Sequence, residues 1–157
     1  MKKEVKLLAK LAGLSLVGVI PFTVSNTVHA NSWHNGNPKI MQGYWRTTNT
    51  YSKGHSRSYI KITKHSISTA LVAKTTVKGK QYKQFDNGLP SFTKTHYRYL
   101  GKHGYQVKGA VWYATGTKSM KVRIAGKYML MKDGSWSGKV VKISKSAYKQ
   151  GLTPIAH

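Results

Sequence analysis

Short segments in which apolar and polar residues alternate run from residue 41 to near the end of the chain, and they constrain its fold most strongly. In segment 118–125 (KSMKVRIA), for example, every second residue is apolar and lysine or arginine stands between. Strand side chains point alternately to the two faces of a sheet, so this period predicts half-buried strands. Glycine-containing breaks such as Lys78-Gly79 and Asp133-Gly134 predict tight turns, the latter most clearly a hairpin. The chain is therefore predicted to be all-β and antiparallel.

Ten segments are predicted as strands on this pattern. Residues 81–94 lack a convincing period and contain Asn-Gly and proline, so they are predicted to form the longest loop. A short helical tail is predicted from Ser146 to near Gly151. The predicted strands are 42–49, 57–63, 66–73, 75–78, 95–100, 103–107, 109–115, 118–125, 127–132 and 139–144.

So many short strands predict a closed or nearly closed β-barrel, because closure removes the strand edges that promote aggregation. A β-sandwich is the alternative architecture for the same pattern. The length fits one β-rich domain over residues 41–157, and the preceding residues 31–40 are rich in Asn, Gly and Pro. We expect those ten residues to form a flexible arm that leads into the domain.

Residues 1–30 have the parts of a secretory signal peptide. Four lysines lie in the first ten residues, and the apolar signal helix over residues 11–24 is interrupted by a proline and too short for a transmembrane anchor. Residues 28–30 (VHA) predict cleavage before Asn31. The chain has no cysteine, so an exported domain depends on packing instead of disulfides. Exported proteins of Gram-positive bacteria also commonly lack disulfides.

Charge is the strongest indication of a partner. The chain has 27 Lys and Arg against three Asp and Glu, a formal net charge of +24. Loss of residues 1–30 removes four lysines and one glutamate, which leaves 23 basic and two acidic residues and a net charge near +21. The two remaining acidic side chains, Asp86 and Asp133, cannot neutralise this charge. It must be balanced by salt or by an anionic partner.

Two resemblances add to this interpretation. Gly43-Tyr44-Trp45, preceded by an arm, resembles the opening strand of lipocalin-like (calycin) barrels. That resemblance implies a tryptophan that closes one barrel end and a late arginine partner, for which Arg123 is the candidate. The signal peptide, the segment PKIMQGYWRT and the Lys/Tyr-rich strands are also similar to small secreted basic proteins of lactic acid bacteria, most of which have no assigned activity. This second resemblance implies surroundings rich in anionic wall polymer.

Residues for catalysis or metal binding are scarce. Asp86 and Asp133 both lie in turn sequences, so they do not form the carboxylate pair that glycosidases use. Cysteine and a Gly-x-Ser-x-Gly elbow are absent from the sequence, and the histidines lack zinc-ligand spacing. The chain is predicted not to be an enzyme and to need no cofactor.

The leading hypothesis is a secreted, non-catalytic protein that associates electrostatically with the cell wall and binds teichoic acid or acidic polysaccharide. One alternative is a lipocalin-like carrier of a small apolar ligand, which would require an empty interior. Another is a secreted cationic antimicrobial; nucleic acid is disfavoured by the compartment. The candidate polyanion contacts are Lys61, Arg98, Lys121, Arg123 and Lys142. The candidate barrel-interior residues are Trp45, Tyr97, Tyr99, Val111, Tyr113 and Met129.

Overall fold

The computed structural model describes residues 32–48, 56–88, 91–111, 113–134 and 136–156. The predicted signal peptide and its cleavage site lie outside these residues. Strands dominate the described chain, and one α-helix follows the last strand. In chain order, the elements are β1 (His34–Asn35), the 3-10 helix η1 (Lys39–Met41), β2 (Gly43–Thr47), β3 (Ser56–Ile62), β4 (Ser66–Val77), β5 (Lys80–Asn87), β6 (Phe92–Gly101), β7 (Gly104–Ala110), β8 (Thr117–Ala125), β9 (Tyr128–Asp133), β10 (Trp136–Ile143) and α1 (Lys145–Leu152).

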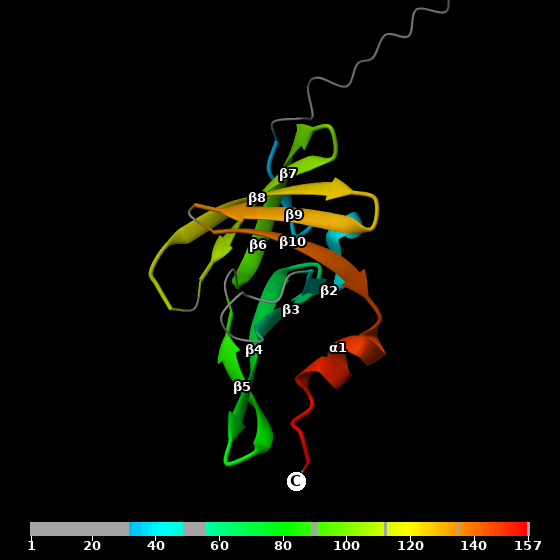
Figure 1. The fold of residues 1–157 in the computed structure, drawn as a ribbon. Helices are drawn as coiled ribbons and strands as arrows, with labels where there is room; N and C mark the ends of the chain where they lie inside the picture. The colour runs from blue at the N-terminus through cyan, green and yellow to red at the C-terminus, as the bar shows by residue number, and fades with distance from the viewer. Residues whose placement is uncertain (1–31, 49–55, 89–90, 112, 135, 157) are drawn as a thin grey trace, which may run out of the picture.

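Eight antiparallel strands form a closed barrel (Figure 1). Around the barrel the order is β6-β7-β8-β9-β10-β2-β3-β4, so almost every strand pairs with its neighbour in the sequence. The first two residues of β4 pair with β6, and β10 pairs with β2. The predicted barrel is confirmed. The sheet closes on itself instead of splitting into two layers, so the sandwich alternative is wrong.

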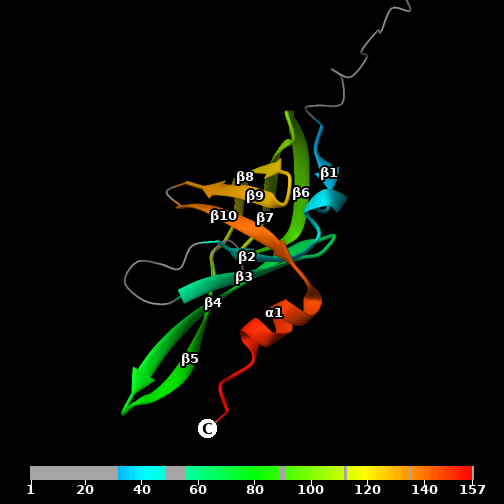
Figure 2. The ribbon, with the colours of Figure 1, turned by 45° about the vertical axis from the view of Figure 1, so that its right-hand side comes forward.

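A long hairpin of β4 and β5 projects from the barrel (Figures 1 and 2). The predicted strands 66–73 and 75–78 are one strand of 12 residues, and β5 occupies the first half of the predicted loop 81–94. The turn explains this difference. Lys78 and Gly79 have φ values of 48° and 78°, and a two-residue turn with positive φ at both positions matches the twist of a hairpin. The chain therefore returns directly along β4.

Other predicted elements are present with shifted bounds. The predicted strands 103–107 and 109–115 form the single strand β7, which ends at Ala110. The helical tail begins at Lys145, one residue earlier than predicted, because the Ser144 hydroxyl caps it. Asp133 and Trp136 pair directly, which confirms the predicted hairpin between β9 and β10.

The segment predicted as a flexible arm, 31–40, packs along the barrel wall where it is described. Its β1 pairs with β6, and Asn37 is buried and donates hydrogen bonds of 2.9 and 3.1 Å to the carbonyls of Thr63, just after β3, and Ser66, at the start of β4. The Trp33 ring lies 4.1 Å from Lys108 Nζ and 5.2 Å from the Arg98 guanidinium carbon. Cation–π contacts thus hold the arm against the outside of the barrel.

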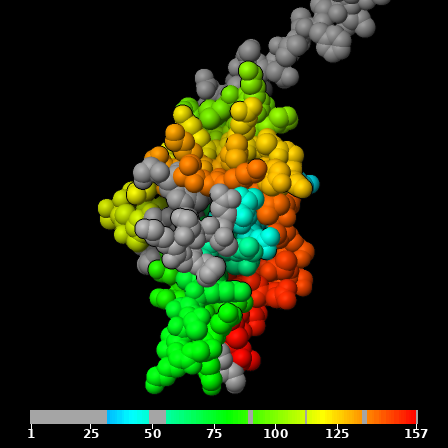
Figure 3. Space-filling view, viewed as in Figure 1, coloured from blue at the N-terminus to red at the C-terminus, as the bar shows by residue number. Residues whose placement is uncertain are grey.

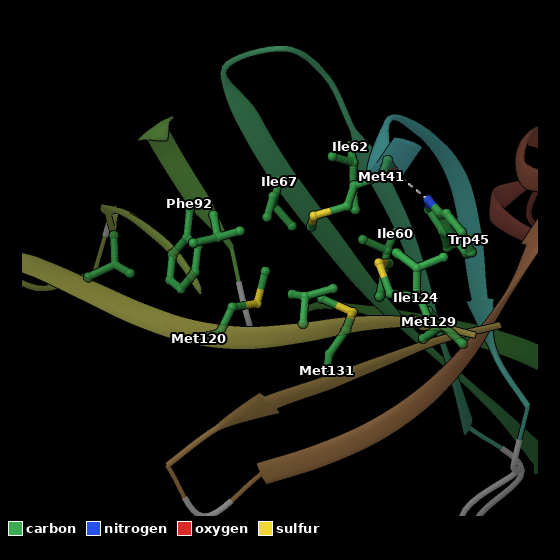
Figure 4. Packing of buried hydrophobic residues seen from close by; sticks show 14 residues of the cluster. Met41, Trp45, Ile60, Ile62, Ile67, Phe92, Met120, Ile124, Met129 and Met131 are labelled. Carbon is green, nitrogen blue, oxygen red and sulfur yellow. Dashed lines mark hydrogen bonds between the residues drawn. The ribbon is translucent and has the colours of Figure 1, made fainter. Parts of the chain in front are cut away.

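Inward-pointing apolar side chains fill the barrel (Figure 4). Four methionines take part, and their flexible side chains suit an irregular interior. Trp45 Nε1 donates a 2.8 Å hydrogen bond to the Met41 carbonyl, so the buried indole has its partner in η1. The buried cluster contains Met41, Trp45, Ile60, Ile62, Ile67, Phe92, Val107, Val111, Met120, Val122, Ile124, Met129, Met131 and Val140.

Candidate anion-binding site

The five cations predicted as polyanion contacts do not converge on one site. Lys121 and Arg123 lie together on β8, and Lys61 is exposed on β3. Arg98 stacks on Trp33, and its Nε donates a 2.9 Å hydrogen bond to Gln106. Part of the guanidinium is therefore already engaged within the protein.

Lys142 takes a position that strand alternation alone did not predict. It pairs directly with Trp45, so both side chains lie on the same face of the sheet, and Lys142 Nζ is 5.4 Å from the indole centre. A Cβ at Gly43, where φ is 129°, would lie 3.2 Å from Lys142 Cε, so glycine leaves room for the lysine. The cationic partner of the tryptophan is Lys142 of the last strand. Arg123 instead lines a hollow on the outside of the barrel.

The candidate interior residues divide into two groups. Trp45, Val111 and Met129 are buried in the core, and Tyr97 packs against it. Tyr99 and Tyr113 are instead 37% and 41% exposed. Tyr99 lies near the tip of the β6–β7 hairpin, and Tyr113 follows the end of β7, so neither is enclosed by neighbouring strands.

A cationic hollow of about 610 Å³ lies between α1 and the outer face of β2 to β5. We call it the helix groove. Figure 3 shows the β4–β5 hairpin and α1 side by side at the lower end of the molecule. The groove is lined by Arg46, Arg57, Tyr59, Val72, Lys74, Thr76, Gln81, Lys83, Ala147, Gln150 and Gly151.

Four cations cross the groove in a row, one from each strand. The strand registers make Arg46 and Arg57 diagonal neighbours, and likewise Arg57 and Lys74, whereas Lys74 lies directly opposite Lys83. Diagonal neighbours in an antiparallel sheet are about 7–8 Å apart, and direct partners are closer. The four positive groups therefore share one continuous strip of surface.

Among the residues that the structure describes, no carboxylate lines the helix groove. Asp86 is the acidic residue of β5, but it stands next to Phe85, whose partner Val72 lines the groove. Alternation therefore turns Asp86 to the opposite face of the hairpin, where it accepts a 2.7 Å hydrogen bond from the Asn87 amide. Arg46 Nε is buried and has no hydrogen-bond partner among the described residues.

Tyrosine contacts dock α1 on the barrel. The Tyr148 ring lies 4.9 Å from the ring of Tyr44 and 6.3 Å from that of Tyr59, the latter edge to face. Burial raises the pKa of the Tyr148 hydroxyl, and the neighbouring Tyr44 raises it further. At its N-terminus the helix is capped by Ser144 Oγ, which accepts a 3.1 Å hydrogen bond from the Ala147 amide.

Lys83 and Gly151 determine how closely α1 packs on the sheet. Lys83 Nζ donates to the carbonyls of Gln150, Gly151 and Thr153 at 3.3, 3.3 and 2.8 Å. These carbonyls carry the partial negative charge of a helix C-terminus, which suits a cation. A Cβ at Gly151 would collide with the Tyr59 ring, so glycine permits this close approach.

A second hollow, of about 520 Å³, lies on the outer face of β8, β9 and β10; we call it the β8–β10 shelf. Lys121 and Lys132 are directly opposite each other there. The shelf also includes Leu100 and Leu130, which are 45% and 42% exposed. Its lining residues are Leu100, Gly104, Lys121, Val122, Arg123, Leu130, Met131, Lys132, Ser137, Gly138 and Lys139.

No protein-family model, curated protein or solved structure matches this chain. Within the described ranges, no helix has both the length and the apolar character needed to cross a membrane. In the same part of the chain, no three His, Cys, Asp or Glu side chains are placed to hold a metal ion.

The cations of the helix groove were absent from the sequence-based set of contacts. A signal for two of them was present: a two-residue turn at Lys78 and Gly79 sets a register in which residue 74 faces residue 83. The contribution of Arg46 had no such signal, because it depends on where α1 docks.

Proposed function

We propose that this protein is a secreted, non-catalytic binder of anionic cell-envelope polymers, either teichoic acid or acidic polysaccharide. The observation that supports this function best is the helix groove, where cations from four strands meet and none of the described lining residues is a carboxylate. Clefts lined by charges of one sign concentrate ligands of the opposite sign. An anionic polymer supplies the charges that the protein lacks.

Binding would combine local contacts with general attraction. Arginines hold phosphate or carboxylate oxygens through paired N–H groups, and lysines act as point charges. The β8–β10 shelf and the exposed Lys61 extend the positive surface beyond the groove. A polymer chain would therefore be held at several places, and each contact would release counterions from it.

The barrel interior favours this function over the carriage of an apolar ligand. Carrier sites are cavities of about 300–1,000 Å³. Fourteen buried side chains of the described residues occupy the barrel core, and both hollows described above lie on the outside. The outer surface is the part of the molecule with unmatched charge.

A sedimentation assay tests the proposed function. Residues 31–157, which carry every strand of the closed barrel, are mixed with isolated Gram-positive cell walls and pelleted at rising salt concentration. Walls stripped of teichoic acid serve as the control. We expect binding at low salt that falls steeply as salt rises and that weakens on stripped walls. Little binding at low salt would refute the proposal.

A further inference from the structure

We propose that the helix groove is a specific binding site for a phosphate group, held by Arg46, Arg57 and Lys74. This inference rests on the proposed function, because it names the chemical group of the polymer that the protein recognises. It goes beyond general attraction in assigning one site with defined donors.

The fold leaves positive charge in the groove unmatched. Like charges placed directly opposite in a sheet destabilise it, yet Lys74 and Lys83 form such a pair. Arg46 and Arg57 continue the row on β2 and β3, and no carboxylate lines the groove within the described part of the chain. Carbonyls at the end of α1 already partner Lys83, so an anion bound in the groove would offset the charge of Lys74 and the two arginines.

Arg46 also carries a hydrogen-bond donor that the described residues leave without an acceptor. Buried polar groups in folded proteins nearly always have a hydrogen-bond partner, and an exception needs an explanation such as a bound ion. Arg46 Nε is such an exception, and its residue lines the groove. A ligand oxygen in the groove would accept this hydrogen bond once a movement of the Arg46 side chain uncovers Nε.

Lys83 differs from the other three cations. Its ammonium group already donates to three carbonyls at the C-terminal end of α1, at 2.8 to 3.3 Å. The helix end thus supplies its negative partner. Arg46, Arg57 and Lys74 remain to bind a ligand, and they come from three different strands.

The arrangement of these donors favours phosphate over carboxylate. A single bidentate arginine satisfies both oxygens of a carboxylate, which lie in one plane. A phosphate is tetrahedral and presents its oxygens in several directions, so two arginines and a lysine spaced along a diagonal can share it. Tyr59 and Val72 lie between these cations and provide an apolar surface for the carbon chain attached to the phosphate.

The size of the groove agrees with a phosphate that belongs to a larger molecule. About 610 Å³ lies within the range of sites that bind drug-sized ligands, which is more than a free phosphate fills. A phosphate in a polymer and free inorganic phosphate share the same chemistry here. The two sources are separated by measuring both probes.

Calorimetry at physiological ionic strength tests the site. The probes are inorganic phosphate, a short poly(glycerol phosphate) chain and, as a carboxylate polymer, polygalacturonate. The groove variant is Arg57→Gln with Lys74→Gln, and the matched control is Lys121→Gln with Lys132→Gln on the β8–β10 shelf. Both variants lose two positive charges, and both leave Arg46 in place.

We expect the groove variant to bind poly(glycerol phosphate) about tenfold more weakly or worse, and the shelf variant to lose about twofold at most, since charge-assisted hydrogen bonds are lost only from the groove. The affinity for polygalacturonate should fall by about the same factor in both variants, because this polymer is attracted to the positive surface in general. Weaker binding of inorganic phosphate at the same site would identify the polymer phosphate as the preferred source. Equal or tighter binding of inorganic phosphate would identify free phosphate.

A second measurement keeps the test valid if the double variant folds poorly. In the unaltered protein, we expect the NMR signal of the Arg46 Nε–H group to shift on addition of either phosphate probe. Lys74→Gln alone, a change at an exposed position, should weaken that response. An unchanged Arg46 signal at saturating probe would overturn the proposal.

Different results would refute the phosphate site and the proposed polymer function. If the groove and shelf variants lose the same affinity for poly(glycerol phosphate), the specific phosphate site is overturned. Wall binding by general charge attraction would still stand. Absence of wall binding in the sedimentation assay would refute the polymer function, whereas phosphate-induced shifts at Arg46 would still establish the site.

Discussion

The helix groove and the β8–β10 shelf both collect cations on the outer face of the barrel, yet they differ in what covers them. In the groove, α1 forms a wall, Val72 is only 5% exposed and the Nε atom of Arg46 is buried. The shelf is an uncovered sheet surface, where Leu130 is 42% exposed.

This difference shows that a covering element changes what a charged sheet face can do. Exposed cations are screened by salt, whereas partly buried charges are screened much less. Alternation places lysine and arginine outward in both regions, but docking of the helix encloses them in one region only. We therefore expect the groove to retain a ligand at salt concentrations that empty the shelf.

Gly151→Val is expected to have the largest effect, because it removes the wall that distinguishes the groove. A side chain at this position collides with Tyr59, so α1 cannot dock at its present height. Overpacking of this kind destabilises by about 1–3 kcal/mol. Urea unfolding measures this loss, and calorimetry should show phosphate binding reduced by about tenfold or more, as for loss of charge-assisted contacts.

The control for this change is Gln150→Ala, next to Gly151 on the same helix, where truncation introduces no collision. It should leave both stability and phosphate affinity nearly unchanged. If Gly151→Val keeps its phosphate affinity, the wall is not needed, and the groove and the shelf are equivalent surfaces.

Lys83→Met should have a smaller effect on the same wall. It removes the donor to three carbonyls at the end of α1 and leaves their partial negative charge unopposed. The expected loss is about 1 kcal/mol, typical of a charge at a helix end. Lys80→Met removes the same charge from an exposed position of the same hairpin and is the matched control. Equal unfolding curves for the two variants would show that Lys83 does not hold the helix.

A dependence on alkaline pH should also report on α1. Burial and Tyr44 raise the pKa of Tyr148 above its ordinary value of 10.0, so the folded state holds this proton more tightly than the unfolded state. The resulting stability is complete below the ordinary value and is lost as pH rises through the raised one. Stability should therefore fall from about pH 10 upward.

Tyr148→Phe should make that decline shallower, as seen in urea unfolding over this pH range. Tyr105 allows a comparison within the barrel, because burial and then the neighbouring Tyr99 and Tyr97 raise its pKa too. Tyr105→Phe should also reduce the decline, without altering phosphate binding at high pH. An identical pH profile in Tyr148→Phe and the unaltered protein would contradict this explanation of helix docking.

The smallest effect is expected on the shelf. Leu130→Ser changes a side chain that is already partly in water, so stability should move by no more than about 0.5 kcal/mol. The control is Met131→Ser on the same strand, because Met131 is 1% exposed and its truncation should cost about 2–5 kcal/mol. Thermal unfolding measures both. A large loss from Leu130→Ser would mean that the shelf is packed as tightly as the groove.

Local patterns in the sequence were enough to predict the barrel. Period-two alternation identified most strands, and the Asp133-Gly134 turn identified the β9–β10 hairpin. The error over residues 81–94 came from polar residues without an apolar period. Both faces of β5 are largely exposed where it runs past the barrel, so no buried face marks it in the sequence.

Such local patterns predicted less of the candidate site. Sequence reasoning placed cations on outward faces, and Lys121 and Arg123 do line the shelf. It could not bring Lys83 to the end of α1, since the bonded Thr153 carbonyl is 70 residues away in the chain. Nor could it place Lys142 over Trp45, because that contact depends on the register of β10 against β2.

The sequence by itself determined the excess of positive charge, the strand period and the turns, because each depends on composition or on residues close together in the chain. Tertiary structure alone decided which cations became enclosed. Barrel closure joins β10 to β2, and this positions α1 over the outer face that carries Arg46. A groove depends on the packing of distant elements, and period and composition do not encode that packing locally.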